Sequence, residues 1–276
     1  MLAPQLLRGA ILSPLKRAPF DAPLPDSRPA VSELRVDVEQ LDAYSRLCGF
    51  PTPGTGHGHR VLPLTYPHVL AFPLAMRLMT TRAFPLPLLG LVHTSIEIEQ
   101  RRALTTDESL ELRVHASKLA PHRRGTEATL VTEARVDGAA VWTSSSTYLA
   151  RHRTTTAPAT PRASKDEALP ALGEWTLPRD LGRRYGAVSG DRNPIHLYPL
   201  TARLLGFPRA IAHGMWTAAR CLAERGSTEA SHAAHAAVEF KAPVLLPSTV
   251  TYAAEGPAFQ LRDPATGALH LSGTLR

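Results

Sequence analysis

The sequence of 276 residues predicts an α+β fold made of two similar halves, in each of which an antiparallel sheet wraps around one central helix. In both halves an apolar helix precedes runs that alternate apolar and polar residues, a pattern typical of strands with one covered face. The motif H-x-x-(I/V)-E-(I/F) occurs at residues 93–98 and again at 235–240. Each copy falls on the first strand after the apolar helix, so the repeat predicts a duplication.

The first half contains two predicted helices and four predicted strands. A short helix is expected at 38–47, a Gly/Pro-rich loop at 51–59, and an apolar helix at 66–80 that Pro73 interrupts. Alternating residues then predict strands at 92–99, 108–116, 126–135 and 141–149.

The second half repeats this order. Apolar spacing predicts helices at 181–188, 200–205 and 212–225. Strands are expected at 234–241, 249–254, 258–262 and 268–275, the last two flanking a D-P-A-T-G turn at 263–267.

A non-periodic stretch rich in Thr, Ala and Pro at 151–173 separates the halves, as expected of a linker. We therefore divide the chain into an N-terminal arm (1–30), a first unit (31–150), the linker (151–173) and a second unit (174–276). The two sheets should join or pack with both central helices on one concave side. A single large sheet, or a first half without a central helix, would argue against duplication.

Composition excludes several classes of protein. Hydrophobic residues make up 43% of the chain, and the apolar stretch at 61–79 contains His68, Arg77 and three prolines, so no membrane span is predicted. The net charge is +7, but the arginines are spread along the chain instead of forming the stripe of a nucleic-acid binder. Cys48 and Cys221 have no metal-ligand spacing, which predicts buried free thiols. Without a recognisable signal segment, we expect a cytoplasmic protein.

The candidate chemistry lies in two segments, YGAVSGDRNPIH at 185–196 and GFPRAIAHGM at 206–215. Asp191 and His196 bracket Asn193-Pro194, which opposes helix continuation and lets the carboxylate and imidazole converge on a loop. Such a pair supplies the two proton transfers needed to add water to an activated alkene or remove it. The helix start at Gly214 offers backbone N–H groups to a thioester oxygen.

These two segments resemble the hydratase-2 signature of the MaoC-like dehydratases, Y-x-x-x-S-G-D-x-N-P-x-H followed by A-H-G-M. The whole chain resembles the double hot-dog members of that family, whose N-terminal half has lost the catalytic motif. The resemblance implies that Asp191 and His196 are catalytic. It also implies that Asn193 holds the pair or the water, and that the Gly214 N–H polarises the thioester carbonyl.

Other residues in and near these segments have simpler interpretations. Ser189 lacks a G-x-S-x-G elbow and is assigned a structural role. His213 is expected to shape the helix entry and stays outside the catalytic set. The His57/His59 pair has no carboxylate or cysteine nearby in sequence, so no metal site is predicted.

The first half has no D-x-N-P-x-H motif, and its corresponding loop at 54–60 contains no aspartate. One active site per chain is therefore expected. The family relation implies that the degenerate half opens an acyl tunnel, for which the 66–79 helix offers Leu70, Phe72, Leu74, Met76, Leu78 and Met79. These residues are equally compatible with simple core packing.

The sequence thus predicts an (R)-specific enoyl-thioester hydratase or 3-hydroxyacyl-thioester dehydratase that needs no cofactor. Its partner would be an acyl-coenzyme A or acyl carrier protein thioester. The sequence is also compatible with a homodimer. A non-catalytic acyl-binding subunit and a hot-dog thioesterase are the alternatives. The carrier, the chain length and the direction of the reaction are not encoded in any motif.

Overall fold

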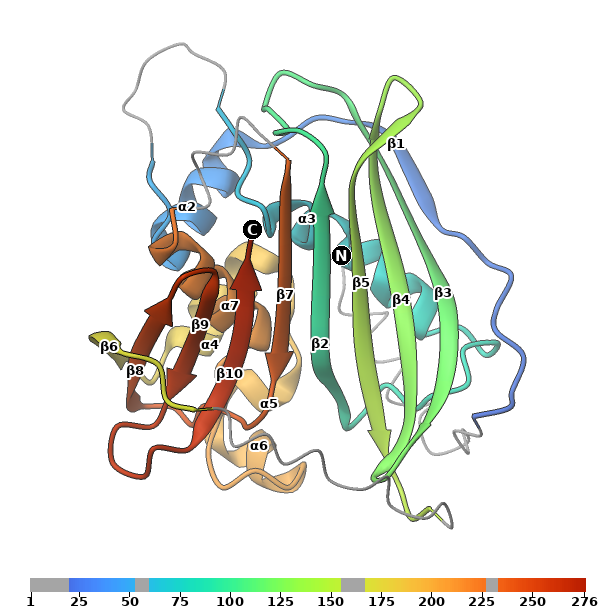
Figure 1. The fold of residues 1–276 in the computed structure, drawn as a ribbon. Coiled ribbons are helices and arrows are strands. Elements are labelled where there is room, and N and C mark those ends of the chain that lie inside the picture. The colour runs from blue at the N-terminus through green and yellow to red at the C-terminus, as the bar shows by residue number, and fades with distance from the viewer. Residues whose placement is uncertain (1–19, 53–59, 155–166, 227–232) are drawn as a thin grey trace.

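The computed structural model describes residues 20–52, 60–154, 167–226 and 233–276, and its described strands form one antiparallel sheet (Figure 1). The sheet order is β1-β3-β4-β5-β2-β7-β10-β9-β8-β6. The strands are β1 (Ala30–Leu34), β2 (Leu91–Gln100), β3 (Leu110–His122), β4 (Gly125–Val136), β5 (Ala139–Arg151), β6 (Ala171–Leu177), β7 (Ala234–Phe240), β8 (Ser248–Glu255), β9 (Ala258–Arg262) and β10 (Leu269–Leu275).

The sheet is continuous, yet its order contains two equivalent halves. The first five strands read β1-β3-β4-β5-β2, and reading inward from the other edge gives β6-β8-β9-β10-β7. The halves meet where β2 pairs with β7, and Ile96 lies opposite Val238. These two residues occupy the same position of the sequence repeat, so a pseudo-twofold axis passes between them. The double hot-dog fold is confirmed. The criterion that a single large sheet would argue against duplication was wrong, because two half-sheets that join edge to edge through β2 and β7 also form one sheet.

The first half contributes α2 (Val38–Cys48), which packs against α4 and α7 of the second half, and α3 (Tyr66–Met79), which lies behind its own strands (Figure 1). The Asp37 carboxylate accepts the Glu39 and Gln40 backbone N–H groups to begin α2, and Gly49, with φ 82°, ends it. Helix α3 packs against β3 and β4. It runs through Pro73 without the expected interruption, because the residues on both sides of the proline are anchored in the core.

The second half contains α4 (Leu181–Ser189), α5 (Pro194–Leu197), α6 (Pro199–Leu204) and α7 (Gly214–Glu224). The central helix α7 packs against β9 and β10, on the same side of the sheet as α3 (Figure 1). The turn α5 falls where only a loop was predicted. Asn193 caps it and Pro194 occupies its first position, where a missing N–H does no harm.

The two edge strands were not predicted. β1 begins at Ala30, at the end of the expected arm, and β6 begins at Ala171, inside the stretch assigned to the linker. Both strands are short and largely exposed, so they lack the apolar alternation that marks the inner strands. The predicted loop at 51–59, with His57 and His59, lies mostly outside the described residues, as does most of the arm.

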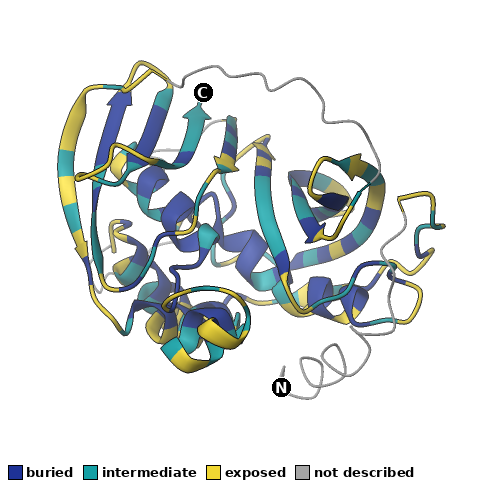
Figure 2. Cartoon of the chain, turned by 90° about the horizontal axis from the view of Figure 1, so that it is seen from below, coloured by how far each residue is buried: buried dark blue, intermediate teal, exposed yellow. Residues whose placement is uncertain are grey.

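The core lies where the helices meet the inner face of the sheet (Figure 2). Fully buried Trp142 donates its indole N–H to the Leu64 carbonyl at 2.9 Å, and Trp216 of α7 donates to the Leu47 carbonyl of α2 at 3.0 Å. The second bond ties the two halves together. Cys48 and Cys221 are buried free thiols, as predicted.

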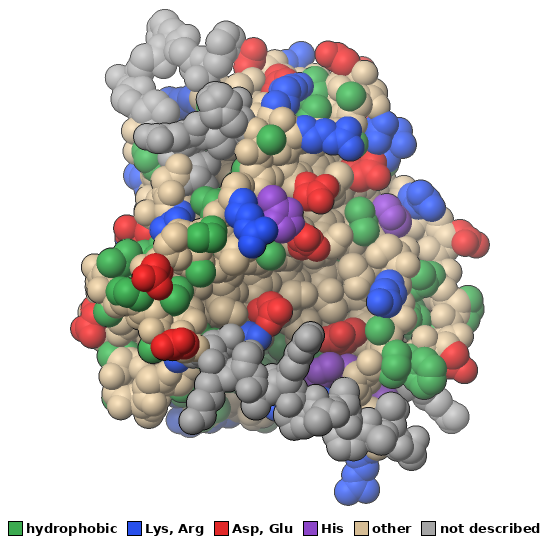
Figure 3. Space-filling view, in the orientation of Figure 1, with side chains coloured by type: hydrophobic (Ala, Val, Ile, Leu, Met, Phe, Trp, Pro, Cys, Tyr) green, Lys and Arg blue, Asp and Glu red, His purple; other side chains and the backbone are tan. Residues whose placement is uncertain are grey.

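On the sheet face drawn in Figure 3, basic and acidic side chains are interspersed and no continuous basic stripe crosses it. Among the described residues, no helix has the length and apolarity needed to span a membrane.

Candidate active site

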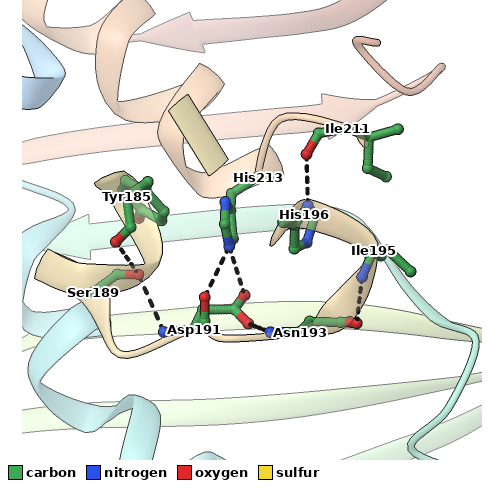
Figure 4. A network of polar contacts seen from close by, with 8 residues as sticks. All are labelled: Tyr185, Ser189, Asp191, Asn193, Ile195, His196, Ile211 and His213. Carbon is green, nitrogen blue, oxygen red and sulfur yellow. Dashed lines mark hydrogen bonds and ion pairs between the residues drawn. The ribbon is translucent and has the colours of Figure 1, made fainter. Parts of the chain in front are cut away.

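The catalytic loop begins where α4 stops. Gly190 adopts a left-handed conformation with φ 77° and turns the chain away from the helix. The Ser189 hydroxyl donates to the Tyr185 carbonyl at 2.8 Å and accepts the Asp191 backbone N–H at 3.2 Å (Figure 4). Ser189 therefore has the structural role expected of it, which is to fix the backbone at Asp191.

Asn193 orders the loop between Asp191 and α5. Its backbone N–H donates to Asp191 Oδ1 at 3.0 Å, and its side-chain oxygen accepts the Ile195 N–H at 3.4 Å (Figure 4). The side-chain oxygen is thus engaged in capping α5, and it is the backbone of Asn193 that holds the carboxylate. Asn193 also lines the cavity described below.

His196 is oriented by the segment that precedes α7. Its Nδ1 lies 2.8 Å from the Ile211 carbonyl (Figure 4). Because a carbonyl can only accept, Nδ1 carries the proton of the neutral ring and Nε2 keeps its lone pair. The Ile211 N–H donates in turn to the Ile195 carbonyl at 3.2 Å. These two bonds fix both the tautomer and the direction of the imidazole.

His213 lies at the centre of the site, although it stood outside the predicted catalytic set. Its Nε2 donates to the Asp191 carbonyl at 3.0 Å and lies 3.8 Å from Asp191 Oδ2. Its ring stacks on His196 with centroids 3.7 Å apart. Its place in A-H-G-M was the only sequence signal for this position, because the contacts cross from α7 to the catalytic loop (Figure 4).

Three glycines allow this close packing. A Cβ on Gly182 would lie 1.9 Å from the His196 carbonyl oxygen, and one on Gly186 would lie 2.7 Å from the Asp191 carbonyl oxygen. A Cβ on Gly214 would stand 3.1 Å from the Phe240 ring. Gly182 and Gly186 of α4 therefore have no room for a side chain against the catalytic loop, whereas a side chain at Gly214 would require the Phe240 ring to shift by a few tenths of an ångström.

Burial brings the two predicted catalytic groups closer in proton affinity. It raises the pKa of the Asp191 carboxyl above its ordinary value, opposed by His196 and by the Asn193 backbone. It lowers the pKa of His196, opposed by Asp191 and by the bond to Ile211. Since the ordinary values are about 3.9 and 6.5, opposite shifts make the pKa values converge. Convergent values suit groups that exchange protons with one substrate.

These groups open onto one cavity of about 560 Å³. Asp191, His196 and Gly214 line it from the second half. The first half contributes an apolar wall from α3 and from the segment that follows it, namely Phe72, Met76, Met79, Leu88, Leu89 and Leu91. The Asp191 side chain is 28% exposed, and it lines this cavity.

Helix α3 presents only one side to the cavity. Phe72, Met76 and Met79 line it, spaced four and three residues apart as one face of a helix requires. Leu70, Leu74 and Leu78, which were also offered for a tunnel, are not among the lining residues and pack against the core instead. Of the six α3 residues that the sequence offered for a tunnel, three therefore line the cavity and three pack against the core.

Gly214 is the first residue of α7, so its N–H belongs to the turn that has no intrahelical acceptors. That position faces the cavity beside the catalytic loop. The ligand atoms of Asp191, His196 and His213 lie within 4.8 Å of one another, a spacing that also suits a metal ion. Nδ1 of His196 and Nε2 of His213 are already bonded to carbonyls, and acid–base chemistry at this cluster needs no ion.

Comparisons with known proteins agree with this site. A model of the MaoC like domain matches residues 146–263, which include the catalytic loop and α7. The 3-hydroxyacyl-thioester dehydratase X of Mycobacterium tuberculosis is 38% identical over 98% of this chain and 96% of its own length.

Solved structures give the same result. The crystal structure of HtdX from Mycobacterium tuberculosis has a TM-score of 0.77 and 35% identity, covering 91% of this chain and 99% of that one. A MaoC-like dehydratase from Phytophthora capsici shares the fold, with a TM-score of 0.70 at 16% identity over 93% of this chain and 96% of that one. The catalytic loop and the cavity between the two hot-dog halves agree with these matches. This chain belongs to the MaoC-like dehydratase family.

Proposed function

We propose that this protein interconverts (R)-3-hydroxyacyl thioesters and trans-2-enoyl thioesters by removing or adding water. Hydro-lyase chemistry follows from the family, and the relative from Mycobacterium tuberculosis is named as a 3-hydroxyacyl-thioester dehydratase. The observation that carries the proposal is the convergence of Asp191 and His196 in one cavity beside the first N–H of α7.

In the dehydration direction, one group of the pair removes the proton from the α-carbon. The carbon–oxygen bond at the β-carbon then breaks, and the other group protonates the departing hydroxyl so that it leaves as water. His196 Nε2 has the free lone pair for the first task or, once protonated, the proton for the second. Hydration runs through the same steps in reverse.

Negative charge grows on the thioester oxygen while the α-carbon loses its proton. The Gly214 N–H is our candidate to stabilise it, because a fixed donor at a helix start requires no reorganisation during the reaction. His213 and Asn193 act as positioning residues: His213 holds the Asp191 backbone, and Asn193 holds its carboxylate.

The carrier and compartment remain proposals of the same kind. The substrate is an acyl-coenzyme A or acyl carrier protein thioester, and no cofactor takes part because proton transfer and carbonyl polarisation suffice. Two free, buried thiols suit a reducing cytoplasm. The origin of the site supports the division into a first and a second unit, and β6 moves the start of the second unit from residue 174 to Ala171. The residues of the pair come from the second unit and the apolar wall from the first.

The test is the loss of enoyl-thioester absorbance on addition of the protein, across a chain-length series on both carriers. Formation of the 3-hydroxyacyl thioester supports the proposal. Release of free acid instead would identify a thioesterase, and binding without either product would identify an acyl-binding subunit.

A further inference from the structure

An exposed apolar surface lies on the two short helices that follow the catalytic loop. Tyr198, Leu200 and Leu204 are 54%, 69% and 78% exposed, and they are three of the eight exposed large hydrophobic residues in the described part of the chain. Leu200 and Leu204 stand four residues apart on α6 and share one side of the helix, whereas Ala202 is buried on the other. Exposed apolar side chains that cluster in this way mark interaction sites.

Arginines accompany these apolar residues, and no acidic residue occurs from residue 192 to residue 223. Exposed Arg203 lies on α6 itself, and exposed Arg209 follows in the next loop. Arg183 of α4 donates to the Leu197 carbonyl at 3.2 Å, and its guanidinium lies 5.5 Å from the centroid of the Tyr198 ring. None of the three arginines forms an ion pair with a described carboxylate. We call this positively charged apolar area the α6 surface: Tyr198, Leu200, Leu204, Arg183, Arg203 and Arg209.

The α6 surface borders the mouth of the active-site cavity. Phe207, in the loop after α6, lines the cavity, and so does Pro194, whose carbonyl accepts the Thr201 hydroxyl of α6 at 2.6 Å. From the first half, exposed Arg151 also lines the cavity, and its guanidinium lies 5.9 Å from the centroid of the Phe207 ring. Figure 1 shows α6 and the end of β5 at the same end of the molecule. Because a lining residue that is exposed lies at the opening, α6 stands beside the entry route of the substrate.

The chemistry of the α6 surface favours one kind of occupant. Coenzyme A is a small molecule, and a thioester of it that enters the cavity leaves the two leucines of α6 in water. A second copy of this chain, related by twofold symmetry, would bring the arginines of one α6 surface toward those of the other. An acidic protein with apolar residues of its own covers the leucines and pairs with the arginines. Of the two carriers that the proposed function allows, acyl carrier protein is such a protein.

We propose that the α6 surface is the docking site of an acidic acyl carrier protein, which passes its thioester on a phosphopantetheine arm into the neighbouring cavity. The inference rests on the proposed function, and it names the carrier. Leu200 and Leu204 contact apolar residues of the carrier protein, and Arg183 and Arg203 pair with its carboxylates. Such charge pairs at the rim act mainly on the rate of association, which falls as salt screens the charges.

The experiment measures hydration of one medium-chain trans-2-enoyl group on three carriers: the acyl carrier protein of the source organism, coenzyme A and free pantetheine. Arg203→Glu and Leu204→Ser should each raise KM for the carrier-protein thioester about tenfold, leave its kcat unchanged, and leave both small thioesters unaffected. Arg203→Lys keeps the charge and should stay within about twofold of the wild type. The controls Arg101→Glu and Leu172→Ser change exposed residues of the same types elsewhere and should alter none of the three substrates. Thermal melting checks that every variant folds.

A titration with fluorescently labelled carrier protein tests docking without turnover. Binding should weaken as salt rises, and it should weaken in both Arg203→Glu and Leu204→Ser. Unchanged carrier-protein kinetics in both variants, or equal losses on all three carriers, would show that the α6 surface does not dock the carrier protein. A dimer in light scattering that Leu204→Ser dissociates, with carrier-protein binding unaffected, would assign the surface to a second copy instead. If no enoyl thioester reacts on any carrier, the proposed function fails, and the titration still decides whether the carrier protein docks here.

Discussion

At the residue scale, the site depends on hydrogen bonds that leave one reactive atom free on each group. The Ile211 carbonyl accepts a hydrogen bond from Nδ1–H of His196, and the Asn193 backbone N–H donates to one oxygen of Asp191. Nε2 of His196 and the second carboxylate oxygen then remain for the substrate. Because each group has a different partner, substituting one leaves the other in place.

We expect Asp191→Asn and His196→Gln each to lower turnover by about 10²- to 10⁴-fold, the usual contribution of a proton-transfer group. The double variant should be little worse than the weaker single variant, because the two groups serve one reaction. Steady-state hydration kinetics measure the effect, and thermal melting checks the fold. Near-normal rates in either variant with an unchanged melting temperature would remove that residue from the mechanism.

Gly182→Ala tests the close contact under the catalytic loop. The new Cβ would lie 1.9 Å from the His196 carbonyl oxygen, so the α5 backbone must move and carry the imidazole with it. We expect at least a tenfold loss of kcat/KM and a destabilisation of about 1–3 kcal/mol, the usual range for overpacking.

The matched control is Gly173→Ala in β6, where a new Cβ meets nothing within 4 Å. It should retain both activity and melting temperature. Equal behaviour of the two alanine variants would show that α4 tolerates a side chain at residue 182 and that the contact does not position His196.

At the element scale, one side of the apolar helix α3 lines the cavity and the other side packs in the core. Its low amphipathicity gave no indication of which side would face the cavity, because both sides are buried by different neighbours. Contacts with β3 and β4 decide the core side, and the side left over becomes the cavity wall.

Met76→Trp should therefore shorten the substrate range. The larger ring would enter the cavity and depress kcat/KM for long enoyl thioesters at least tenfold more than for crotonyl thioester, which does not reach that segment. Leu74→Trp lies on the core side, so we expect it to lower the melting temperature with no preference between chain lengths. Equal losses on both substrates for Met76→Trp would contradict an acyl channel along α3.

At the scale of the whole molecule, buried neutral histidines couple stability to pH. Folding depresses the pKa of His68 to about 4 and of His93 to about 3, against about 6.5 in an unfolded chain. A depressed pKa means that the unfolded state binds more protons, so this stability is complete above pH ~6.5 and is lost as the pH falls toward 4.

Each such histidine adds a slope of up to about 1.4 kcal/mol per pH unit in that window. Denaturant unfolding at several pH values should therefore show a shallower loss of stability below pH ~6.5 for His93→Phe than for the wild type. Met79→Leu changes the same cavity without a titrating group and should keep the wild-type slope. An unchanged slope in His93→Phe would mean that folding does not lower the pKa of His93.

A comparison of the predicted with the observed helices and strands shows which elements local sequence patterns encode. Alternation and apolar spacing predicted the longer helices and most inner strands to within about two residues at each end, because burial of one face produces a periodic residue pattern. The exception is β3, which continues to His122, beyond its predicted end at residue 116. β1, β6 and α5 have little such pattern, since exposed edges and a single turn bury few side chains.

The sequence by itself determined the duplication, the family and the position of Asp191 and His196, because each is recognised from short motifs, one of which recurs in both halves. Only the tertiary structure decided what surrounds them. Packing across the β2–β7 junction brings His93, Tyr148 and the α3 side chains to the catalytic loop, and these contacts join segments about half a chain apart. The contact between His213 and Asp191 lies within the second half, where the start of α7 packs on the catalytic loop. No spacing in the sequence encodes either set of contacts, because both depend on which face each helix buries.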